Sequence, residues 1–298
     1  MKIGAVIVVY NFEQRDFTLV MRQLAEQVDQ LCVVDNSAKN SESFFSQFPH
    51  TVYLPLHENK GIAYAQNVGI KRLIEEGTDY ILFSDQDTLI PQGAVKRLID
   101  DTILLEQQGW RVGGVCPRAY NADTGEPYPH QVNKMADRVL NNGANVFTEV
   151  TFCMNSMSLI KAEWFKKVGL METELFIDGV DSEWCWRAAN MLELRFFVDE
   201  SLHMQHHLGI GNRKIGGKIR SMTPPGRMYY QYRNYIWLLR RKYVPRKWKT
   251  YNGWKYLIKI AYYGMFVAPR LEYVRKIMSG VTAGCHRQKE KDKTNRQL

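Results

Sequence analysis

The feature of this sequence that most constrains its fold is a series of short apolar runs, each of which ends in polar residues. The run Tyr80–Phe83 leads into Asp85 and Asp87, and the runs Ile3–Tyr10 and Leu31–Val34 precede it, with segments of helical periodicity between them. Short uninterrupted apolar runs suit strands that are buried on both faces, as in a parallel sheet. Strands that alternate with helices at these intervals predict a right-handed parallel α/β layer.

The same periodicity predicts further elements along the chain. Helices are expected over residues 15–28, 62–74, 91–108 and 161–168 and from near residue 181, and strands over 51–56, 111–116 and 149–160. Residues 120–145 are rich in Asn, Pro and Gly, so they are expected to form a loop or insertion over the sheet.

Asp85 and Asp87 follow the strand that is expected over Tyr80–Phe83. In open α/β sheets the ligand crevice lies outside the carboxyl ends of the strands, so these side chains would project into it. Two hard oxygen ligands suit Mg²⁺ or Mn²⁺, which take their remaining ligands from water and a substrate diphosphate. The alternative is that polar residues here, with Thr88, cap a helix that starts near Pro91.

A second group of carboxylates, Asp178, Asp181 and Glu183, lies beside Trp184. If a helix starts near Asp181, Glu183 and Arg187 are i, i+4 partners, which on a surface contribute only a few tenths of a kcal/mol. The group is then a capped amphipathic helix. General-base chemistry is the alternative, because three carboxylates are more than a cap requires.

Three of the seven histidines fall within residues 202–209, including His206 and His207. Imidazole suits a divalent metal or a phosphate oxygen, although a single histidine is more often a partly buried polar ring. The five cysteines are widely spaced, without a Cys-x-x-Cys pair, so the sequence indicates neither a disulfide framework nor a zinc site, and a reducing cytosol is expected. The glycine motifs of dinucleotide-binding, P-loop and α/β-hydrolase proteins are absent from the sequence.

The charge is distributed unevenly along the chain. Residues 1–210 contain 18 Lys and Arg against 28 Asp and Glu, whereas residues 211–298 contain 22 against 3. Within the basic part, apolar stripes around Tyr232 and Trp254 lie at helical spacing beside basic residues, and neither segment offers about 20 uninterrupted apolar residues. These helices are expected to bind an anionic membrane surface without crossing it.

Two alternatives stay open for this basic part. The helices could instead pack on the rest of the protein or on another subunit, which leaves an oligomer through them open. Basic residues interleaved with aromatic ones are also typical of single-stranded nucleic-acid binding. We favour the membrane surface and expect no nucleic-acid partner.

Several segments resemble, in the same order, the inverting family 2 glycosyltransferases of the GT-A fold, and among them the bacterial rhamnosyltransferases. The segments are Val8–Asn11, Val34–Ser37, Asn59–Asn67, Asp85–Asp87 and Phe176–Trp184. The resemblance extends to 227–243, which is similar to a basic, aromatic helix that follows the catalytic domain. It implies a GT-A fold with a mostly parallel sheet, a catalytic domain over 1–215, with a nucleotide-sugar half to about 116, and a helical region over 216–298 with a disordered tail from about 285.

The resemblance also implies roles for individual residues. Asp181 would be the catalytic base, and Asp87 would hold the metal, with His207 or its neighbour His206 assisting. The acceptor side would include Asp178, Glu183 and Trp184, with the indole offering an apolar face to a sugar ring. The residues expected to bind the nucleotide sugar are Tyr10, Asp35, Asn59, Gly61, Asn67, Asp85 and Gln86, with Asp35 at the base and Asp85 near the ribose.

The implied reaction is metal-dependent transfer of L-rhamnose from dTDP-β-L-rhamnose to a lipid-linked or polysaccharide acceptor at the cytoplasmic face of the membrane. Val180 replaces the Glu of the usual Glu-Asp pair, as in the rhamnosyl subgroup, and Met157 departs from the pattern in the acceptor wall. Another donor such as a UDP-hexose is the alternative within the family. A sugar-phosphate nucleotidyltransferase would need a Gly-rich, Arg-containing loop after the first strand, and Asn11–Glu13 is not that loop.

Overall fold

The computed structural model describes residues 1–122, 124–128, 139–141, 145–206, 212–215 and 218–294. The chain divides into two compact units, of which the first holds residues 1–176 and 180–207 and the second holds 177–179 and 208–298. The sequence predicts one boundary near residue 215. The structure places the division earlier, and it assigns the short segment 177–179 to the second unit, where helix α7 (Pro225–Leu239) binds it.

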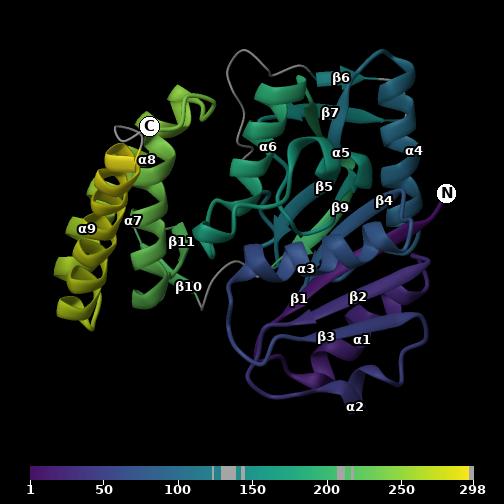
Figure 1. Cartoon of the computed structure of the whole chain (residues 1–298), viewed down its shortest axis with the longest axis horizontal. Coiled ribbons are helices and arrows are strands. Elements are labelled where there is room, and N and C mark those ends of the chain that lie inside the picture. The colour runs from purple at the N-terminus through teal and green to yellow at the C-terminus, as the bar shows by residue number, and fades with distance from the viewer. Residues whose placement is uncertain (123, 129–138, 142–144, 207–211, 216–217, 295–298) are drawn as a thin grey trace. The chain divides into compact units, whose positions relative to one another are not determined.

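The first unit is built on one mixed sheet, which contains nine strands among the described residues, in the order β3-β2-β1-β4-β8-β5-β9-β7-β6 (Figure 1). Strands β3, β2, β1 and β4 run parallel, β5 pairs with β9 in parallel, and the other neighbours are antiparallel. The strands are β1 (Ile3–Val9), β2 (Gln30–Asp35), β3 (Thr51–Pro55), β4 (Tyr80–Asp85), β5 (Val112–Asn121), β6 (Val139–Asn141), β7 (Val146–Val150), β8 (Ser158–Lys161) and β9 (Arg195–His206). The predicted α/β class is confirmed.

Helices cover both faces of the parallel strands because successive residues of β1 and β2 point to opposite sides. Ala5 and Ile7 of β1 belong to one core cluster with residues of α1, α2 and α4. Val6, on the other side, meets α3, where a Cβ added to Gly69 would lie 2.7 Å from Val6 Cγ1, so glycine permits this close packing. The helices of this unit are α1 (Gln14–Ala25), α2 (Glu42–Phe45), α3 (Ile62–Glu75), α4 (Ala94–Gln107), α5 (Ala162–Val168) and α6 (Val180–Leu192), with a 3₁₀ turn, η1 (Thr173–Leu175).

The part of the first unit that follows β5 differs from its predicted elements. One strand is expected over 149–160, but the chain forms two strands, β7 and β8, separated by a turn in which Met157 has φ +57°. A non-glycine residue in the left-handed region ends a strand, and the periodicity of the sequence does not reveal this. Part of the loop expected over 120–145 is also strand, since β6 pairs with β7.

The second unit contains the hairpin β10 (Asn212–Ile215) and β11 (Lys218–Ser221) and three helices, α7, α8 (Arg246–Phe266) and α9 (Arg270–Thr294). The Tyr232 stripe of α7 packs inside this unit, with Tyr232 3% exposed in a cluster that includes Tyr263 and Ile277, so the packing alternative describes that stripe. A Cβ added to Gly280 of α9 would lie 2.4 Å from the carbonyl oxygen of Tyr229, so the backbones of α7 and α9 are in close contact at this glycine. Helix α9 continues to Thr294, past the residue 285 at which the sequence predicts disorder.

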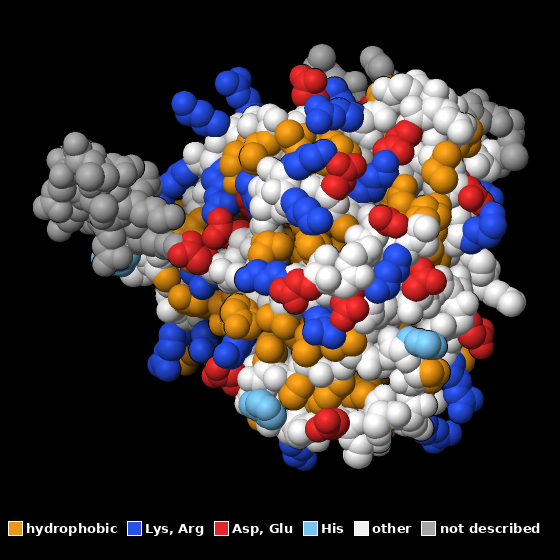
Figure 2. Space-filling view, turned by 45° about the vertical axis from the view of Figure 1, so that its right-hand side comes forward, with side chains coloured by type: hydrophobic (Ala, Val, Ile, Leu, Met, Phe, Trp, Pro, Cys, Tyr) orange, Lys and Arg blue, Asp and Glu red, His pale blue; other side chains and the backbone are white. Residues whose placement is uncertain are grey.

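No helix in the described residues combines the length and apolarity that a bilayer crossing requires. On the face drawn in Figure 2, basic and acidic side chains alternate around small apolar patches. That face therefore carries no extended field of one sign, and the charge excess of residues 211–298 is a property of the second unit.

Candidate active site

The carboxyl ends of β1, β2 and β4 bring three predicted segments together. Strand β1 lies between the other two, and Val9 lies opposite Asp35 in the register with β2. Just beyond the strand ends, the N–H of Tyr10 donates to Oε1 of Gln86 at 2.8 Å. The two residues are 76 positions apart in the sequence, so only the parallel pairing of the strands brings them into contact. Tyr10 is 48% exposed and free to face a planar ligand such as a nucleoside base.

Side-chain amides hold the next segment in place. Oδ1 of Asn59 accepts from Nδ2 of Asn36 at 2.9 Å and from the N–H of Gly61 at 3.0 Å. Oδ1 of Asn36 accepts from the N–H of Lys60 at 2.8 Å. The two amides thus fix the turn that leads into α3. Asn36 is absent from the predicted site residues, although it lies in a segment that the family resemblance includes.

Asp35 is part of this framework and not an exposed carboxylate. It is 0% exposed, Oδ1 accepts from the N–H of Ser37 at 2.9 Å, and Oδ2 accepts from the Tyr53 hydroxyl at 2.8 Å. Burial, together with the Asp35 carboxylate, raises the pKa of Tyr53 to about 12, so the phenol stays a donor. A contact between Asp35 and a nucleoside base would require one of these bonds to be shared or exchanged, and its predicted role stays a prediction.

The two carboxylates after β4 differ in their surroundings. Asp85 is half-buried, and the hydroxyl of Ser156, which is itself 2% exposed, donates to its Oδ2. Asp87 is exposed. Carboxylate oxygens are the donors that Mg²⁺ and Mn²⁺ prefer, so these residues fit a hard divalent cation. Among the described residues, His, Cys, Asp and Glu form no group of three or more that could hold a metal by themselves.

The turn into α3 also contacts the acceptor segment. The N–H of Ile62 donates to the carbonyl oxygen of Phe176 at 2.7 Å. Gly61 has φ +85°, and a Cβ added to it would lie 2.5 Å from Cδ2 of the Phe176 ring. Only glycine suits both the backbone conformation and this close approach. The turn before α3 and the start of the segment 176–184 are therefore packed directly against each other.

Asp181 lies in the first turn of α6 and is half-buried. The N–H of Ser182 donates to its Oδ1 at 2.7 Å. Asp178 precedes it in the segment that belongs to the second unit, where its carboxylate forms a two-pronged ion pair with Arg227 of α7. The position of Asp181 in the first turn fits a carboxylate stabilised by the helix N-terminus.

Three predicted site residues are buried and bind or pack against other parts of the first unit, which corrects their expected roles. Glu183 is 0% exposed and binds Arg187 through both carboxylate oxygens, at 2.9 and 3.1 Å, so the pair is buried and not the surface pair considered from the sequence. Trp184 is 0% exposed, with its ring 4.7 Å from Phe165, so it offers no face to a sugar. Asn67 is 7% exposed, and its amide is bound to the backbone of Met171.

The histidine segment lies partly outside the described residues. His207 lies outside the described residues, and so does its predicted metal or diphosphate contact. The backbone of His206 ends β9. Ser156 is the more informative addition, because it holds Asp85 from the turn between β7 and β8. The only sequence signal for it is the segment 155–158 that departs from the family pattern at Met157.

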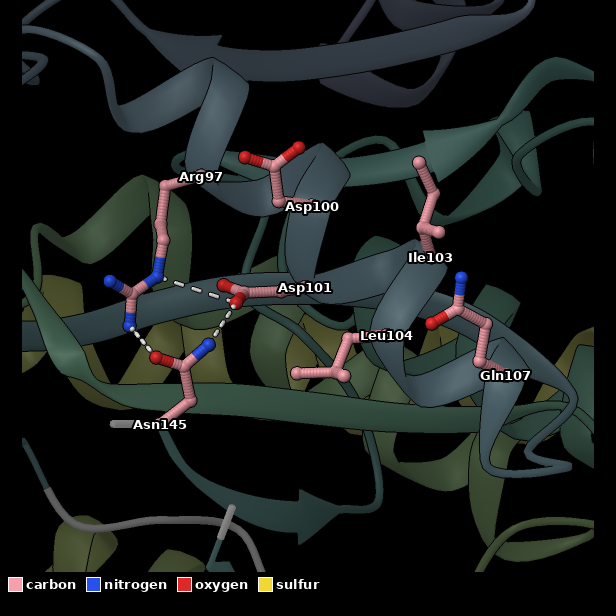
Figure 3. A pocket seen from close by; sticks show the side chains of 7 residues that line it. All are labelled: Arg97, Asp100, Asp101, Ile103, Leu104, Gln107 and Asn145. Carbon is pink, nitrogen blue, oxygen red and sulfur yellow. Dashed lines mark hydrogen bonds and ion pairs between the residues drawn. The ribbon is translucent and has the colours of Figure 1, made fainter. Parts of the chain in front are cut away.

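A separate polar cluster lies on α4 and lines a pocket of about 440 Å³ (Figure 3). Nε of Arg97 lies 3.3 Å from Asp101 and 3.0 Å from Asp199, and both carboxylates are 0% exposed. Burial, and next the adjacent Asp199, raise the pKa of Asp101 to about 8. Asn145 bonds both Arg97 and Asp101. The cluster includes no predicted site residue, and it ties α4 to β9.

Comparison with known proteins identifies the family of the chain. Residues 5–169 match the family described as Glycosyl transferase family 2. Over 248 residues the chain is 32% identical to the dTDP-rhamnosyl transferase RfbF of Shigella flexneri, a match that covers 82% of this chain and 81% of that protein.

Solved structures show the same fold at lower identity. S. aureus TarS has a TM-score of 0.54 at 17% identity, and the match covers 81% of this chain and 40% of the TarS chain. The structure of TarS 1-349 has a TM-score of 0.54 at 14% identity, and the match covers 96% of this chain and 82% of that chain. The structure of GalNAc-T7 with UDP, GalNAc and Mn²⁺ has a TM-score of 0.56 at 12% identity, and the match covers 85% of this chain and 54% of that chain. The fold is that of the GT-A glycosyltransferases. The chain belongs to glycosyl transferase family 2 and is a glycosyltransferase.

Proposed function

We propose that this enzyme transfers L-rhamnose from dTDP-β-L-rhamnose to a hydroxyl group of a saccharide acceptor, with inversion at the anomeric carbon. The observation that carries the proposal is the similarity to the dTDP-rhamnosyl transferase of Shigella flexneri across most of both chains. The segment around Phe176–Trp184, which resembles the rhamnosyl subgroup, supports the same donor.

The donor half would hold the nucleotide. Tyr10, which is 48% exposed, would face the base, and the turn that Asn59 and Gly61 form would line the same half. Asp85, restrained by Ser156, would lie near the ribose. Asp87 would hold Mg²⁺ or Mn²⁺, which when bound offsets the negative charge that grows on the departing diphosphate.

Asp181 would act as the general base in a single displacement. Its carboxylate takes the proton from the acceptor hydroxyl, the acceptor oxygen forms a bond to the anomeric carbon, and the bond from that carbon to the diphosphate oxygen breaks. The electron pair of the broken bond leaves with dTDP. Displacement from the face opposite the leaving group inverts the β-linked donor to an α-L-rhamnoside.

The donor assignment is tested by incubating the protein with Mn²⁺ and a panel of nucleotide sugars and measuring the release of free nucleoside diphosphate. We expect dTDP-β-L-rhamnose to be turned over well above dTDP-glucose and UDP-hexoses. The similarity of the donor segments to a dTDP-rhamnosyl transferase is the reason. Turnover of a UDP-hexose without turnover of dTDP-rhamnose would assign another donor to the same fold and base.

We further propose that the acceptor is lipid-linked and that α8 docks the enzyme on the cytoplasmic face of an anionic membrane. One face of α8 packs within its unit through Asn252 and Tyr263, which are 7% and 4% exposed. The opposite face is apolar and exposed, with Trp254 at 70%, Ile258 at 68% and nearby large apolar side chains above half exposure. Exposed Lys and Arg residues flank this face, and each contributes about 1 kcal/mol near an anionic leaflet.

Replacing Trp254 and Ile258 by Gln is expected to reduce sedimentation with phosphatidylglycerol-containing vesicles by about tenfold or more, since each buried apolar side chain contributes about 1.5–3 kcal/mol. Binding of the unchanged protein should fall at high salt. The matched control replaces Leu19 and Met191, which are 50% and 52% exposed on the first unit, and should bind as the unchanged protein does.

Substitution is preferable to truncation after residue 243, because α8 and α9 supply core partners of Tyr232. Equal binding to neutral vesicles would exclude the electrostatic part of this proposal. A dimer in solution that the same two substitutions dissociate would assign the face to a second copy.

A further inference from the structure

Helix α7 binds the side chain of Asp178 through Arg227. Nε of Arg227 lies 3.0 Å from Oδ1 and 2.9 Å from Oδ2 of Asp178, and Nη2 lies 2.8 Å from Oδ1. The Asp178 side chain is 19% exposed. A planar guanidinium that engages both oxygens fixes direction as well as distance, which a lysine at this position would not do.

A second residue of α7 holds the backbone of the same segment. Nδ2 of Asn234 donates to the carbonyl oxygen of Ile177 at 2.7 Å and to that of Asp178 at 2.9 Å. Asn234 is 2% exposed, so these bonds form away from competing water. Two side chains seven residues apart on α7, Arg227 and Asn234, therefore bind two consecutive positions of this segment, Asp178 through its side chain and Ile177 and Asp178 through their backbone carbonyls.

The backbone of this segment requires such support. Phe176, Asp178 and Gly179 have φ of +65°, +63° and +86°. Left-handed backbone at Phe and Asp is unfavourable and persists where surrounding contacts hold it. Helix α6 begins at the next residue, Val180, and Asp181 follows it. The loop is therefore bonded directly to the first residue of α6, one residue before Asp181.

We propose that Arg227 and Asn234 are positioning residues, which hold the 177–179 loop so that Asp181 meets the acceptor hydroxyl. This inference rests on the proposed role of Asp181. Asp178 then anchors the loop to α7 and is not a second base, because both of its oxygens already accept hydrogen bonds from Arg227. A shift of about 1 Å at a catalytic group can cost about 100-fold in rate, so the effect should appear in kcat.

The test is a double-mutant cycle of Asp178→Asn and Arg227→Gln with kcat, donor KM and thermal unfolding measured for all four proteins. We expect each single change to lower kcat by about 10- to 100-fold, with donor KM changed by less than about threefold. The double variant should lose little more than the worse single variant, because the two residues act as one unit. Arg227→Lys keeps the charge but cannot bind both carboxylate oxygens as the planar guanidinium does, so it should recover only part of kcat. It replaces Arg227→Gln in the cycle if that variant does not fold.

Losses in kcat that multiply in the double variant would overturn the proposal, and so would unchanged kcat with a lowered unfolding temperature, which would make the pair structural only. The control is the exposed pair Lys96 and Asp100 on α4, 2.6 Å apart, where the same cycle should leave kcat unchanged. If Asp181→Asn retains turnover while the Asp178 and Arg227 effects remain coupled, the base assignment fails and the positioning role survives. If Asp181→Asn is inactive and the effects of the Asp178 and Arg227 changes are additive, the base assignment stands and the positioning role fails.

Discussion

Replacing Asp181 by Asn is expected to lower kcat by about two to four orders of magnitude while dTDP binding in the presence of Mn²⁺ stays unchanged. The substitution removes the proposed proton acceptor and keeps the size of the side chain and its place in the first turn of α6. Release of dTDP under saturating donor and acceptor gives kcat, and titration calorimetry with dTDP gives binding.

Asp87→Asn is the matched comparison for Asp181→Asn. It lies at the end of β4 with the donor segments, so it should abolish metal-dependent donor binding and leave metal-independent binding unchanged. Turnover near that of the unchanged protein for Asp181→Asn would refute its role as base. Neither neighbouring carboxylate is a good replacement, since Glu183 is buried against Arg187 and both oxygens of Asp178 accept bonds from Arg227.

Glu183→Ala is expected to destabilise the first unit by about 3 kcal/mol, which is at the low end of the range for breaking a buried ion pair. The Arg187 guanidinium would lose its carboxylate but keep the carbonyl oxygens of Val168 and Leu170, each 2.8 Å away, which moderates the loss. For a unit of this size the unfolding temperature should fall by about 6 to 12 °C.

The control for the stability prediction is Asp100→Ala, which removes one partner of an ion pair whose side chains are 81% and 55% exposed. Surface pairs of this kind contribute little, so the unfolding temperature should barely move. A shift for Glu183→Ala as small as that control would mean that the Arg187 contacts with backbone carbonyls alone hold α6 to the segment before it.

Much of the donor half follows from sequence because its information is local. Short apolar runs at regular intervals define β1, β2 and β4, and their parallel pairing follows from the helices between them. The carboxyl ends of parallel strands share one edge, so Asp85 and Asp87 are expected at the ligand crevice, and the family resemblance adds Tyr10 and Gln86. The family resemblance adds roles to these positions that periodicity alone does not supply.

The roles that the sequence misassigns depend on burial. Glu183 and Trp184 lie in a motif with Asp181. Because a helix places successive residues on different faces, Asp181 stays half-buried while Glu183 and Trp184 are fully buried. Asn67 likewise points from α3 toward Met171. A motif records that residues are adjacent along the chain, whereas accessibility depends on what packs against each face.

What the sequence by itself determines is the α/β order of the first unit, the family, and the carboxylates after β4 and at the start of α6. Only the tertiary structure decides that Ser156 holds Asp85, that Phe176 packs on Gly61, and that α7 grips the loop before Asp181. The reason is physical: each of these contacts joins residues 49 to more than 100 positions apart, and no local periodicity carries the distance between them. The helix stripes are visible in the sequence, but which stripe is buried and which is left exposed is settled by the packing of α7, α8 and α9.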